Sequence, residues 1–252
     1  MDFVKVQGLG NDFIVVDGPF EPTAETVVAW CARRTGIGAD GVLVIEPVDQ
    51  GTVSMRYWNA DGGEAEMCGN GLRCIARLSY ERGWVPHSEF VVRTVVGDHP
   101  VTVMGETVRA FVGVPTTYRT DTLSIAGIDF HPVSIGNPHA VTFVDDVDVA
   151  AVSEIGPVVE NDALFPDRTN VEFVELLDDN VIRSRIWERG VGETPASGTG
   201  ATASAYVAHV VKDVGLPVTV VLRGGELLVT FDDDGAWMQG AAEISYRGTV
   251  KP

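Results

Sequence analysis

Hydrophobic and polar positions alternate in short runs along most of the chain, which predicts a protein built mainly of β-strands. Alternation with a period of two residues indicates strands, and the glycines between the runs mark turns. In the first half, strands are predicted at 12–17, 41–46, 52–59, 90–97, 99–105 and 107–113. In the second half they are predicted near 133–144 and at 170–177, 181–188, 218–224, 226–232 and 236–248.

Helical periodicity is confined to a few segments. A helix is predicted around 25–34, and one well-formed helix follows a glycine-rich loop in each half, from about 70 to 83 and from about 199 to 213. Strands therefore dominate, with a helix after each loop. This mixture predicts an α/β (α+β) fold.

The chain also resembles itself, which points to an internal duplication. A shift of 129 residues places Arg56, Trp58, Gly63, Glu64, Gly69, Gly71 and Ala76 on Arg185, Trp187, Gly192, Glu193, Gly198, Gly200 and Ala205. At the same shift DGVLVIE (40–46) falls on TNVEFVE (169–175), and at a shift of 126 Gly10-Asn11 falls on Gly136-Asn137. The period is too long for a solenoid repeat, so we predict a duplicated domain.

The duplication gives two predicted domains. The first covers 1–115, with the last residues, about 246–252, returning to it, and the second covers 116–245. The junction is expected near 112–121, where proline and polar residues interrupt the pattern.

Composition adds few constraints. The 45% hydrophobic and 21% charged content is ordinary for a soluble globular protein. No apolar run reaches the roughly 18–20 residues of a membrane span, and the N-terminus does not have the pattern of a signal peptide. A cytoplasmic location is therefore expected. The three cysteines are too scattered for a disulfide framework or a zinc site, and no metal is expected.

The net charge of −18 argues against binding to nucleic acid or to anionic membranes. Only 3 of the 18 basic residues are lysine. Two explanations remain open: adaptation to a high-salt cytoplasm, where salt screens repulsion between carboxylates, or a GC-rich genome that favours arginine codons. Stability measured against KCl concentration separates them.

The repeated loop carries the candidate chemistry. EAEMCGNGLR (64–73) returns as ETPASGTGAT (193–202), with Ser197 where the first copy has Cys68. A glycine-rich turn before a helix offers unpaired N–H groups and a favourable dipole to an anion, and the same groups favour the thiolate of a nearby cysteine. We therefore predict a catalytic role for Cys68, with a structural buried thiol as the alternative, and core or helix-face positions for Cys31 and Cys74.

Two such loops suggest a cleft that holds a carboxylate, with one acid–base group on each side of its α-carbon. That arrangement suits inversion of a stereocentre. The sequence resembles the diaminopimelate epimerase family, whose pyridoxal-independent members use two cysteines in this way. The resemblance rests on GLGNDFIVVD (8–17), RTGIGADGVLVIE (34–46), WNADGGEAEMCGNGLRC (58–74), GNPHAVTFVDD (136–146), DRTNVEFVE (167–175) and WERGVGETPASGTG (187–200).

The resemblance implies two similar domains, each a mixed sheet or barrel wrapped around a central helix. It implies epimerisation of L,L-diaminopimelate to the meso form without a cofactor, on the route to lysine and peptidoglycan. The expected partners are a small amino-acid substrate and a second copy of the chain in a homodimer. No nucleic acid, membrane or metal is expected to bind.

Site residues follow by position in the matching blocks. Cys68 is one acid–base residue and Ser197 stands at the place of the other, with His139 and Glu188 close to the pair. The reacting carboxylate is expected on Gly69, Asn70, Gly198 and Thr199. The remaining amino and carboxylate groups are expected on Asn11, Asn59, Asn137, Asn170, Glu188 and Arg189, where the Arg189 guanidinium suits bidentate binding of a distal carboxylate.

Structural roles remain open for several of these residues. Asn11 and Asn137 follow glycines and could be turn residues. Glu188 and Arg189 could form a surface ion pair, and His139 could be an ordinary loop histidine.

Ser197 departs from the family, because a hydroxyl is almost never ionised near pH 7 without a dedicated base. Epimerisation is expected to be severely impaired. Three explanations stay open: a deliberate Cys→Ser change in an epimerase, a divergent member that racemises or β-eliminates another amino acid with one base, and a non-catalytic amino-acid-binding protein.

Overall fold

The computed structural model describes residues 1–117 and 121–251. Its chain forms two compact units, one of Met1–Ala110 with Gln239–Pro252 and one of Phe111–Met238. Strand β8 (Thr107–Gly113) leads out of the first unit, and β17 (Gly235–Ala241) leads back into it. Residues 118–120 of the predicted junction and residue 252 of the predicted returning tail lie outside the described residues.

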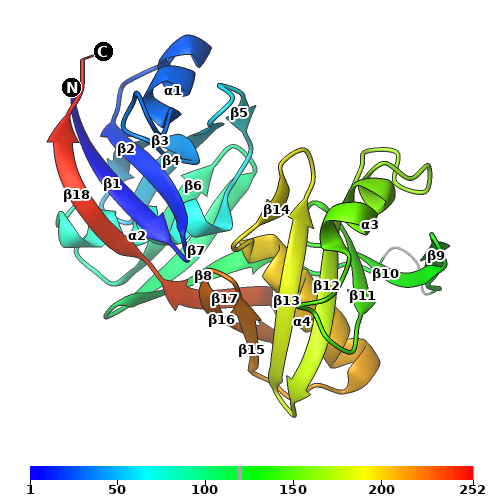
Figure 1. The fold of residues 1–252 in the computed structure, drawn as a ribbon. Coiled ribbons are helices and arrows are strands. Elements are labelled where there is room, and N and C mark those ends of the chain that lie inside the picture. Colours follow the sequence, from blue (N-terminus) through cyan, green and yellow to red (C-terminus); the bar gives the residue numbers. More distant parts are fainter. Residues whose placement is uncertain (118–120, 252) are drawn as a thin grey trace. The chain divides into compact units, whose positions relative to one another are not determined.

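The first unit is a mixed sheet wrapped around one helix (Figure 1). Helix α2 (Gly69–Glu81) packs against β1, β2, β4, β6, β7 and β18 of that sheet. Two pairs are parallel, β2 with β3 and β4 with β6, and the other neighbours run antiparallel. The strands in order are β18 (Glu243–Thr249), β1 (Asp2–Gly8), β2 (Asn11–Asp17), β3 (Gly41–Asp49), β4 (Thr52–Asn59), β6 (Glu89–Thr94), β7 (Gly97–Met104) and β8, with β5 (Glu64–Ala65) on β4.

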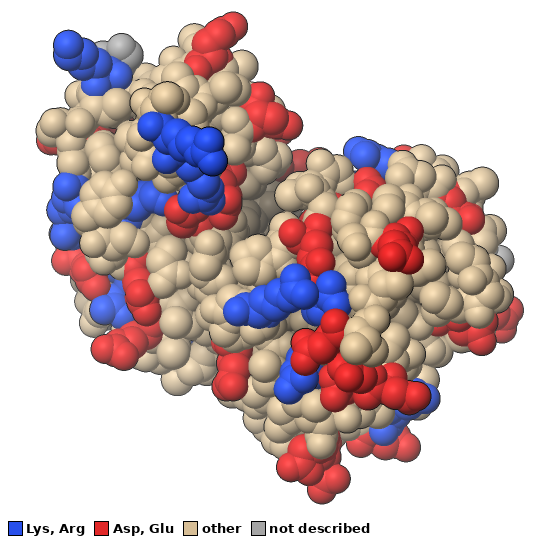
Figure 2. Space-filling model, in the orientation of Figure 1, with Lys and Arg blue, Asp and Glu red and all other residues tan. Residues whose placement is uncertain are grey.

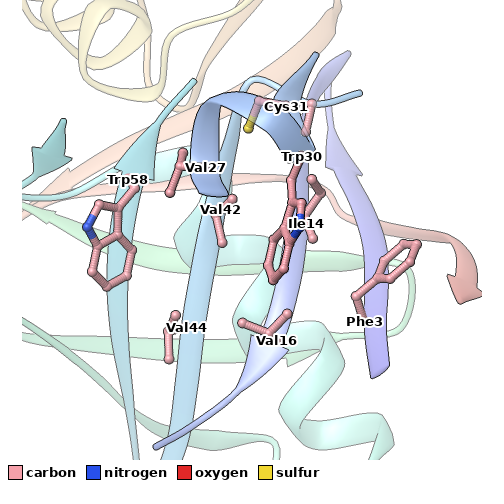
Figure 3. Close-up of a cluster of buried hydrophobic side chains, with 10 residues drawn as sticks. Phe3, Ile14, Val16, Val27, Trp30, Cys31, Val42, Val44 and Trp58 are labelled. Atoms are coloured by element: carbon pink, nitrogen blue, oxygen red, sulfur yellow. The ribbon is translucent and has the colours of Figure 1, made fainter. Parts of the chain in front are cut away.

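Strand β3 is buried on both faces, which explains its continuous apolar sequence. Val42 and Val44 lie in a cluster with Val27 and Trp30 of helix α1 (Ala24–Cys31), shown in Figure 3. Leu43 faces the other way, toward α2, where a Cβ on Gly71 would lie 3.4 Å from its methyl carbons. That is an ordinary van der Waals distance, so Leu43 packs directly against the first turn of α2.

The second unit repeats the plan. Helix α4 (Gly198–Lys212) packs against β10, β11, β12, β13, β15 and β16, and the parallel pairs are β11 with β12 and β13 with β15. Helix α3 (Val152–Glu160) packs in a cluster with residues of β12. The strands are β9 (Leu123–Ile125), β10 (Ile128–Ser134), β11 (Pro138–Phe143), β12 (Asn170–Asp178), β13 (Val181–Glu188), β15 (Val218–Leu222) and β16 (Gly225–Asp232), with β14 (Gly192–Thr194) on β13.

The predicted fold class is therefore confirmed: an α+β protein of two pseudo-symmetric halves, each a mixed sheet around a helix. Several elements were not predicted, namely β1, β9, the short β5 and β14, and helix α3. Helix α3 escaped because Pro157 follows Gly156 within a helix of only nine residues, a pair that normally ends helices. The region near 133–144 contains β10 and β11, and the single strand predicted at 236–248 is two strands, β17 and β18.

Charged side chains of both signs lie interspersed over the face shown in Figure 2. Arginines pair with carboxylates close by, as Arg93 does with Asp98, where Nε and Oδ1 are 2.7 Å apart. Acidic residues outnumber basic ones 36 to 18, and one arginine can serve two carboxylates, as Arg33 does with Asp12 and Asp40. Within the described residues, no helix is long and apolar enough to cross a membrane.

Candidate functional site

The two glycine-rich loops share one backbone conformation. Cys68 is the N-cap of α2, with φ −136° and ψ 118°, and Ser197 is the N-cap of α4, with φ −132° and ψ 126°. An ion pair secures the strand pair before each loop, Arg56 Nε to Glu64 Oε1 at 2.8 Å and Arg185 Nε to Glu193 Oε1 at 2.7 Å. The duplication therefore preserves the direction in which residues 68 and 197 leave the backbone.

Hydrogen bonds join the side chains of Asn11, Cys68 and Asn70, and together with Gly69, the first residue of α2, we call these residues the Cys68 cluster. The half-buried Cys68 donates its S–H to Oδ1 of Asn11, with Sγ 3.5 Å away. Nδ2 of Asn70 donates to the same oxygen at 3.1 Å. The thiol thus lies beside an amide oxygen at the N-terminus of α2, where the first N–H groups have no partner within the helix.

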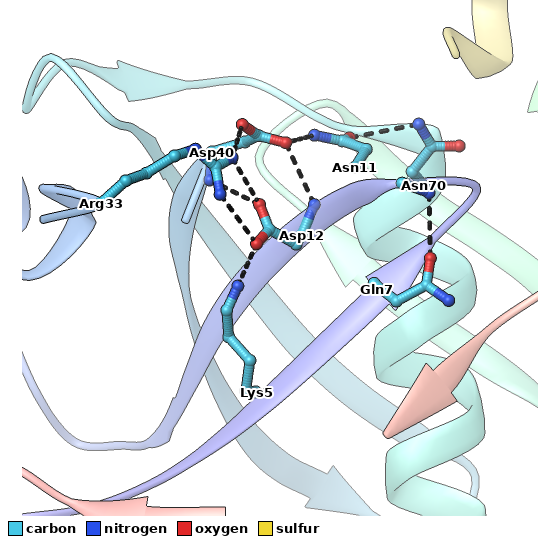
Figure 4. Close-up of polar contacts among 8 residues, drawn as sticks. Lys5, Gln7, Asn11, Asp12, Arg33, Asp40 and Asn70 are labelled. Carbon is cyan, nitrogen blue, oxygen red and sulfur yellow. Dashed lines mark hydrogen bonds and ion pairs between the residues drawn. The ribbon is translucent and has the colours of Figure 1, made fainter. Parts of the chain in front are cut away.

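Asn11 is held in turn by a charged network (Figure 4). Its Nδ2 donates to Oδ2 of Asp40 at 2.7 Å, and Arg33 pairs with Asp40 at 2.6 Å. Arg33 and the buried Lys5 both pair with Asp12. Burial alone would raise the pKa of Asp12, but hydrogen bonds from Arg33 and Lys5 outweigh it and hold that pKa below its usual value. Asp12 is therefore an anion that fixes the network.

Arg73 anchors the other side of the cluster from within α2. Its side chain is fully buried, and Nη2 donates to Oδ1 of Asn70 at 2.9 Å. Burial lowers the pKa of this guanidinium. Burial also raises the pKa of Cys74 to about 12 and that of Cys31 to about 11. Both thiols are buried core groups, as the sequence predicts, and Cys68 is the half-exposed one.

The second loop forms what we call the Ser197 cluster: Asn137, His139, Ser197, Gly198 and Thr199. Ser197 is only 4% exposed, and its Oγ accepts the N–H of Gly200 at 3.3 Å. The hydroxyl thereby caps α4, a role that the Cys68 side chain does not take for α2. Nδ2 of Asn137 donates to Oγ1 of Thr199 at 3.5 Å.

His139 is fully buried between two polar partners. Its Nε2 lies 2.9 Å from Oδ1 of Asn137, and its Nδ1 lies 2.6 Å from Oε1 of Glu172. Glu172 is also fully buried, and burial raises its pKa, only partly offset by His139. The histidine is therefore neither a loop residue nor solvated. It is the second residue of strand β11, and its contact with Asn137 orients that amide.

Glu172 was missed in the sequence, although the signal was there. It occupies the position of Leu43 in the duplication, pointing toward α4 as Leu43 points toward α2: a Cβ on Gly200 would lie 3.1 Å from its Oε1. An acidic residue in the middle of a buried strand needs a partner or a proton. That mismatch between the two repeats marks the position.

The remaining predicted residues of the second unit lie at the end of β13 and at the start of the neighbouring β12. Glu188 is half-buried as its last residue, and Arg189 follows, with Nη1 donating to the carbonyl of Asp167 at 2.9 Å. Asn170 donates from Nδ2 to the carbonyl of Pro138 at 2.9 Å and accepts the Arg189 N–H at 3.0 Å. In this structure Asn170 therefore fixes the backbone of both neighbouring segments.

Glu160 supports the same turn and was not predicted. It is buried at the end of α3, accepts the Gly190 N–H at 2.8 Å and accepts Nε1–H of Trp187 at 2.7 Å. It thus holds the residues on either side of Glu188 and Arg189. Only the fold brings it there, because no local pattern in the sequence links residue 160 to residue 190.

Asn59 lies apart from the hydrogen bonds of the Cys68 cluster. It ends β4, and its backbone closes the turn to Gly62 and Gly63 with two hydrogen bonds of 2.9 Å. The structure thus gathers Asn11, Cys68, Gly69 and Asn70 in one cluster and Asn137, His139, Ser197, Gly198 and Thr199 in another. Across residues 1–117 and 121–251, no group of three or more His, Cys, Asp or Glu side chains could hold a metal ion.

Comparisons with known sequences agree with the duplicated plan. The sequence model of the diaminopimelate epimerase family matches residues 3–118 and 132–247. The diaminopimelate epimerase of Erythrobacter litoralis is 42% identical over 260 residues, covering 99% of this chain and 97% of that protein. The same-named protein of Moorella thermoacetica is 40% identical over 274 residues, covering 98% of each.

Solved structures with this fold have more distant sequences. A PhzF-family phenazine biosynthesis protein from Bacillus anthracis aligns with a TM-score of 0.75 at 19% identity, covering 100% of this chain and 99% of that one. A probable proline racemase from Agrobacterium radiobacter aligns with a TM-score of 0.72 at 15% identity, covering 99% and 92%. At these identities the likeness is one of fold alone.

Proposed function

The chain belongs to the diaminopimelate epimerase family, and we propose that its reaction is the cofactor-independent epimerisation of L,L-diaminopimelate to the meso form. The observation that carries the proposal is the Cys68 cluster. It holds a half-exposed thiol, fixed by a hydrogen bond, at the N-terminus of α2. A carboxylate that binds these N–H groups brings its α-carbon close to the sulfur.

The proposed roles divide between acid–base and binding residues. Cys68 exchanges a proton with the α-carbon, and residue 197 occupies the position of the second acid–base group. The backbone N–H groups of the two loops, at Gly69, Asn70, Gly198 and Thr199, hold the reacting carboxylate. Arg189 binds the distal carboxylate, and the asparagines complete the site together with Glu188: Asn11, Asn59, Asn137 and Asn170. His139 acts through Asn137, because both of its ring nitrogens are engaged inside the unit.

Ser197 limits the rate at which this chain epimerises its substrate. Its hydroxyl accepts the Gly200 N–H as a helix cap and is a far weaker acid than a thiol. Loss of one general acid–base partner typically lowers the rate by about 10²–10⁴-fold. We therefore propose that the chain as written binds the substrate and turns it over poorly.

The test is steady-state epimerisation of L,L-diaminopimelate, followed by chiral separation of the isomers. The chain as written is compared with Ser197→Cys, and Cys68→Ala in the Ser197→Cys background is the matched control. We expect formation of the meso isomer by Ser197→Cys and background rates in the other two. Proline and 4-hydroxyproline serve as competing substrates, and turnover of either in preference to diaminopimelate contradicts the proposal.

The proposed function extends to the domain organisation, the location and the oligomeric state of the protein. We propose the two compact units as the two domains of one epimerase that acts on a free amino acid in the cytoplasm, with a homodimer as its assembly. Sedimentation of the purified protein tests the dimer.

A further inference from the structure

We propose that Glu172 and His139 form a buried positioning pair, which shares the carboxyl proton and thereby fixes the Asn137 amide with its nitrogen toward the first turn of α4. The pair lies inside the second unit, and neither side chain has any exposure. Hydrogen bonds run from Glu172 through His139 and Asn137 to Thr199. The pair sets the direction in which this series of hydrogen bonds points.

The first unit shows that the fold itself does not need a polar pair at this place. At the shift of 126 residues His139 falls on Phe13, and at the shift of 129 residues Glu172 falls on Leu43. The sheet register agrees, because β2 and β3 pair in the same parallel alignment as β11 and β12. Phe13 and Leu43 are both fully buried. An apolar pair thus serves in one half where a polar pair, which is costly to bury, serves in the other.

The surroundings of Glu172 favour its protonated form. Burial raises its pKa, His139 offsets that shift only in part, and Glu188 at the end of β13 adds to it. Beside Glu172 lie Ile186 in β13 and Gly200 in α4, which carry no charge. Within the described residues, Oε2 of Glu172 has no hydrogen-bond partner, and an ionised carboxylate with such an oxygen is costly to bury. The carboxyl group therefore keeps a proton.

That proton decides which ring nitrogen of His139 carries a hydrogen. A neutral histidine brings one hydrogen to the pair, and the protonated carboxyl group brings a second. One of them lies in the contact of 2.6 Å between Oε1 of Glu172 and Nδ1 of His139, so the other must be on Nε2. Without the carboxyl proton, the single hydrogen would lie on Nδ1, and Nε2 would be an acceptor.

Nε2 of His139 in turn decides which end of the Asn137 amide faces it. As a donor it faces Oδ1, at 2.9 Å, and Nδ2 of Asn137 is directed to Oγ1 of Thr199 in the first turn of α4, at 3.5 Å. As an acceptor it would face Nδ2, and the amide would turn its oxygen toward that turn. Because an amide nitrogen has two hydrogens, Nδ2 has a second one to offer to an anion at the helix N-terminus, whereas an amide oxygen there would repel the anion.

The pair should therefore govern the affinity for a carboxylate without touching the substrate itself. This step rests on the proposed function, in which the N–H groups at the start of α4 hold the reacting carboxylate. The direction of the hydrogen bonds does not rest on it. The two parts are tested by two separate measurements.

The first measurement locates the hydrogens on the His139 ring by NMR of the chain as written, with isotope-labelled histidine and without substrate. We expect a hydrogen on Nε2 near pH 7. A histidine beside an ionised carboxylate would instead carry its hydrogen on Nδ1. The His139 signals are assigned by their absence from the double variant His139→Phe, Glu172→Leu. An Nε2 without a hydrogen overturns the proposal.

The second measurement transplants the apolar pair of the first unit into the second. The double variant His139→Phe, Glu172→Leu is made in the chain as written, and calorimetry gives the Kd for L,L-diaminopimelate. We expect the Kd to rise about tenfold or more, the size of one lost hydrogen bond to a charged group. The Tm should not fall, because well-packed apolar residues often replace a buried ionisable pair without loss of stability. An unchanged Kd overturns the proposal.

The matched control is a second buried polar pair of the same unit, changed to Ser184→Ala with Ser204→Ala. Their hydroxyl oxygens lie 3.0 Å apart between β13 and α4, and their counterparts in the first unit are Met55 and Ile75, again an apolar pair. These serines lie outside the series that ends at Thr199. The control should leave the Kd unchanged, and an equal rise in the control would overturn the proposal.

Two arrangements keep the results separable. If the double variant does not fold, His139→Leu replaces His139→Phe in it, because the smaller side chain asks for less room. If the chain as written and the control both fail to bind diaminopimelate while Nε2 carries its hydrogen, the proposed function fails alone. If the chain as written binds and the double variant binds equally well, the positioning pair fails alone.

Discussion

The Cys68 cluster and the Ser197 cluster have the same backbone and different polar interiors. Residues 68 and 197 leave their helices with φ and ψ values that agree within about ten degrees. Behind them, a leucine at position 43 became Glu172, and the arginine at position 73 became Thr202. The duplication thus conserved the scaffold and changed the buried groups that decide which way hydrogen bonds point.

The comparison also separates two kinds of buried charge. Asp12 in the first unit lies among cations that lower its pKa, whereas burial raises the pKa of Glu172 in the second unit. The ionised Asp12 therefore stabilises the first unit at pH values above the usual carboxyl pKa. The protonated Glu172 stabilises the second unit at pH values below it. The same fold accommodates both carboxyl groups, because Asp12 has arginine and lysine as partners whereas Glu172 has His139.

The largest expected effect concerns the two acid–base positions. If they are counterparts, serine at either one should be similarly damaging. Cys68→Ser in the Ser197→Cys background should lower epimerisation by about 10²–10⁴-fold, as Ser197 does in the chain as written. Rates are measured by chiral separation. A loss below tenfold would show that the two loops do not act as a pair.

The next effect concerns the mismatch between Leu43 and Glu172. Leu43→Glu places a carboxyl group against α2 without a histidine partner and should lower the free energy of unfolding by about 3–5 kcal/mol. Leu43→Met keeps the volume and should cost less than about 1.5 kcal/mol. Urea denaturation measures both. Equal stability of the two variants would mean that this position is not buried against the helix.

A pH-dependent effect follows from the raised pKa of Glu172. A carboxyl group that binds its proton more tightly in the folded state contributes stability below the unfolded pKa, near 4.5, and loses it as pH rises through the folded value. The unfolding free energy relative to Glu172→Gln should therefore be highest at low pH and fall as pH rises. Denaturation at a series of pH values measures it. If the stability of the unchanged chain relative to Glu172→Gln instead grows as pH rises, the pKa of Glu172 is not raised in the folded state.

The smallest expected effect is the difference in stability cost between breaking one or the other of the two ion pairs that the duplication repeats. Glu64 and Arg56 are about 40% exposed, so Glu64→Gln should cost about 0.5 kcal/mol and less in high salt. Glu193 and Arg185 are 18% and 10% exposed, and Arg223 lies 2.8 Å from Glu193. Glu193→Gln should cost about 1–2 kcal/mol. A larger loss for Glu64→Gln in thermal denaturation would reverse this ranking.

Much of the fold was predictable because it is written in local patterns. Two-residue alternation and the repeat at 129 residues predict most of the strands, helices α2 and α4, and the two-fold plan. Helix α3 was not predicted because it contains Gly156 and Pro157. Strand β1 was not predicted because it lies before residue 12, where the first recognised alternation begins. These elements depend on tertiary packing more than on propensity.

The candidate site was predictable in its loops and less so in its support. Cys68, Ser197 and their glycines stand out because they recur in matching loops. Glu160 and Asp40 act through contacts with residues about 30 positions away, which no local pattern reveals. Glu172 was visible only as an acid in a buried strand.

The most direct test of the central claim is NMR of L,L-diaminopimelate in D₂O, which follows exchange of the α-hydrogens and formation of the meso isomer together. The account predicts that Ser197→Cys both exchanges and epimerises, while the chain as written does either at below about 1% of that rate, the low end of the expected loss. Rapid epimerisation by the chain as written would contradict the claim that its two loops need a thiol in each. Inertness of both proteins toward this substrate would contradict the proposed function.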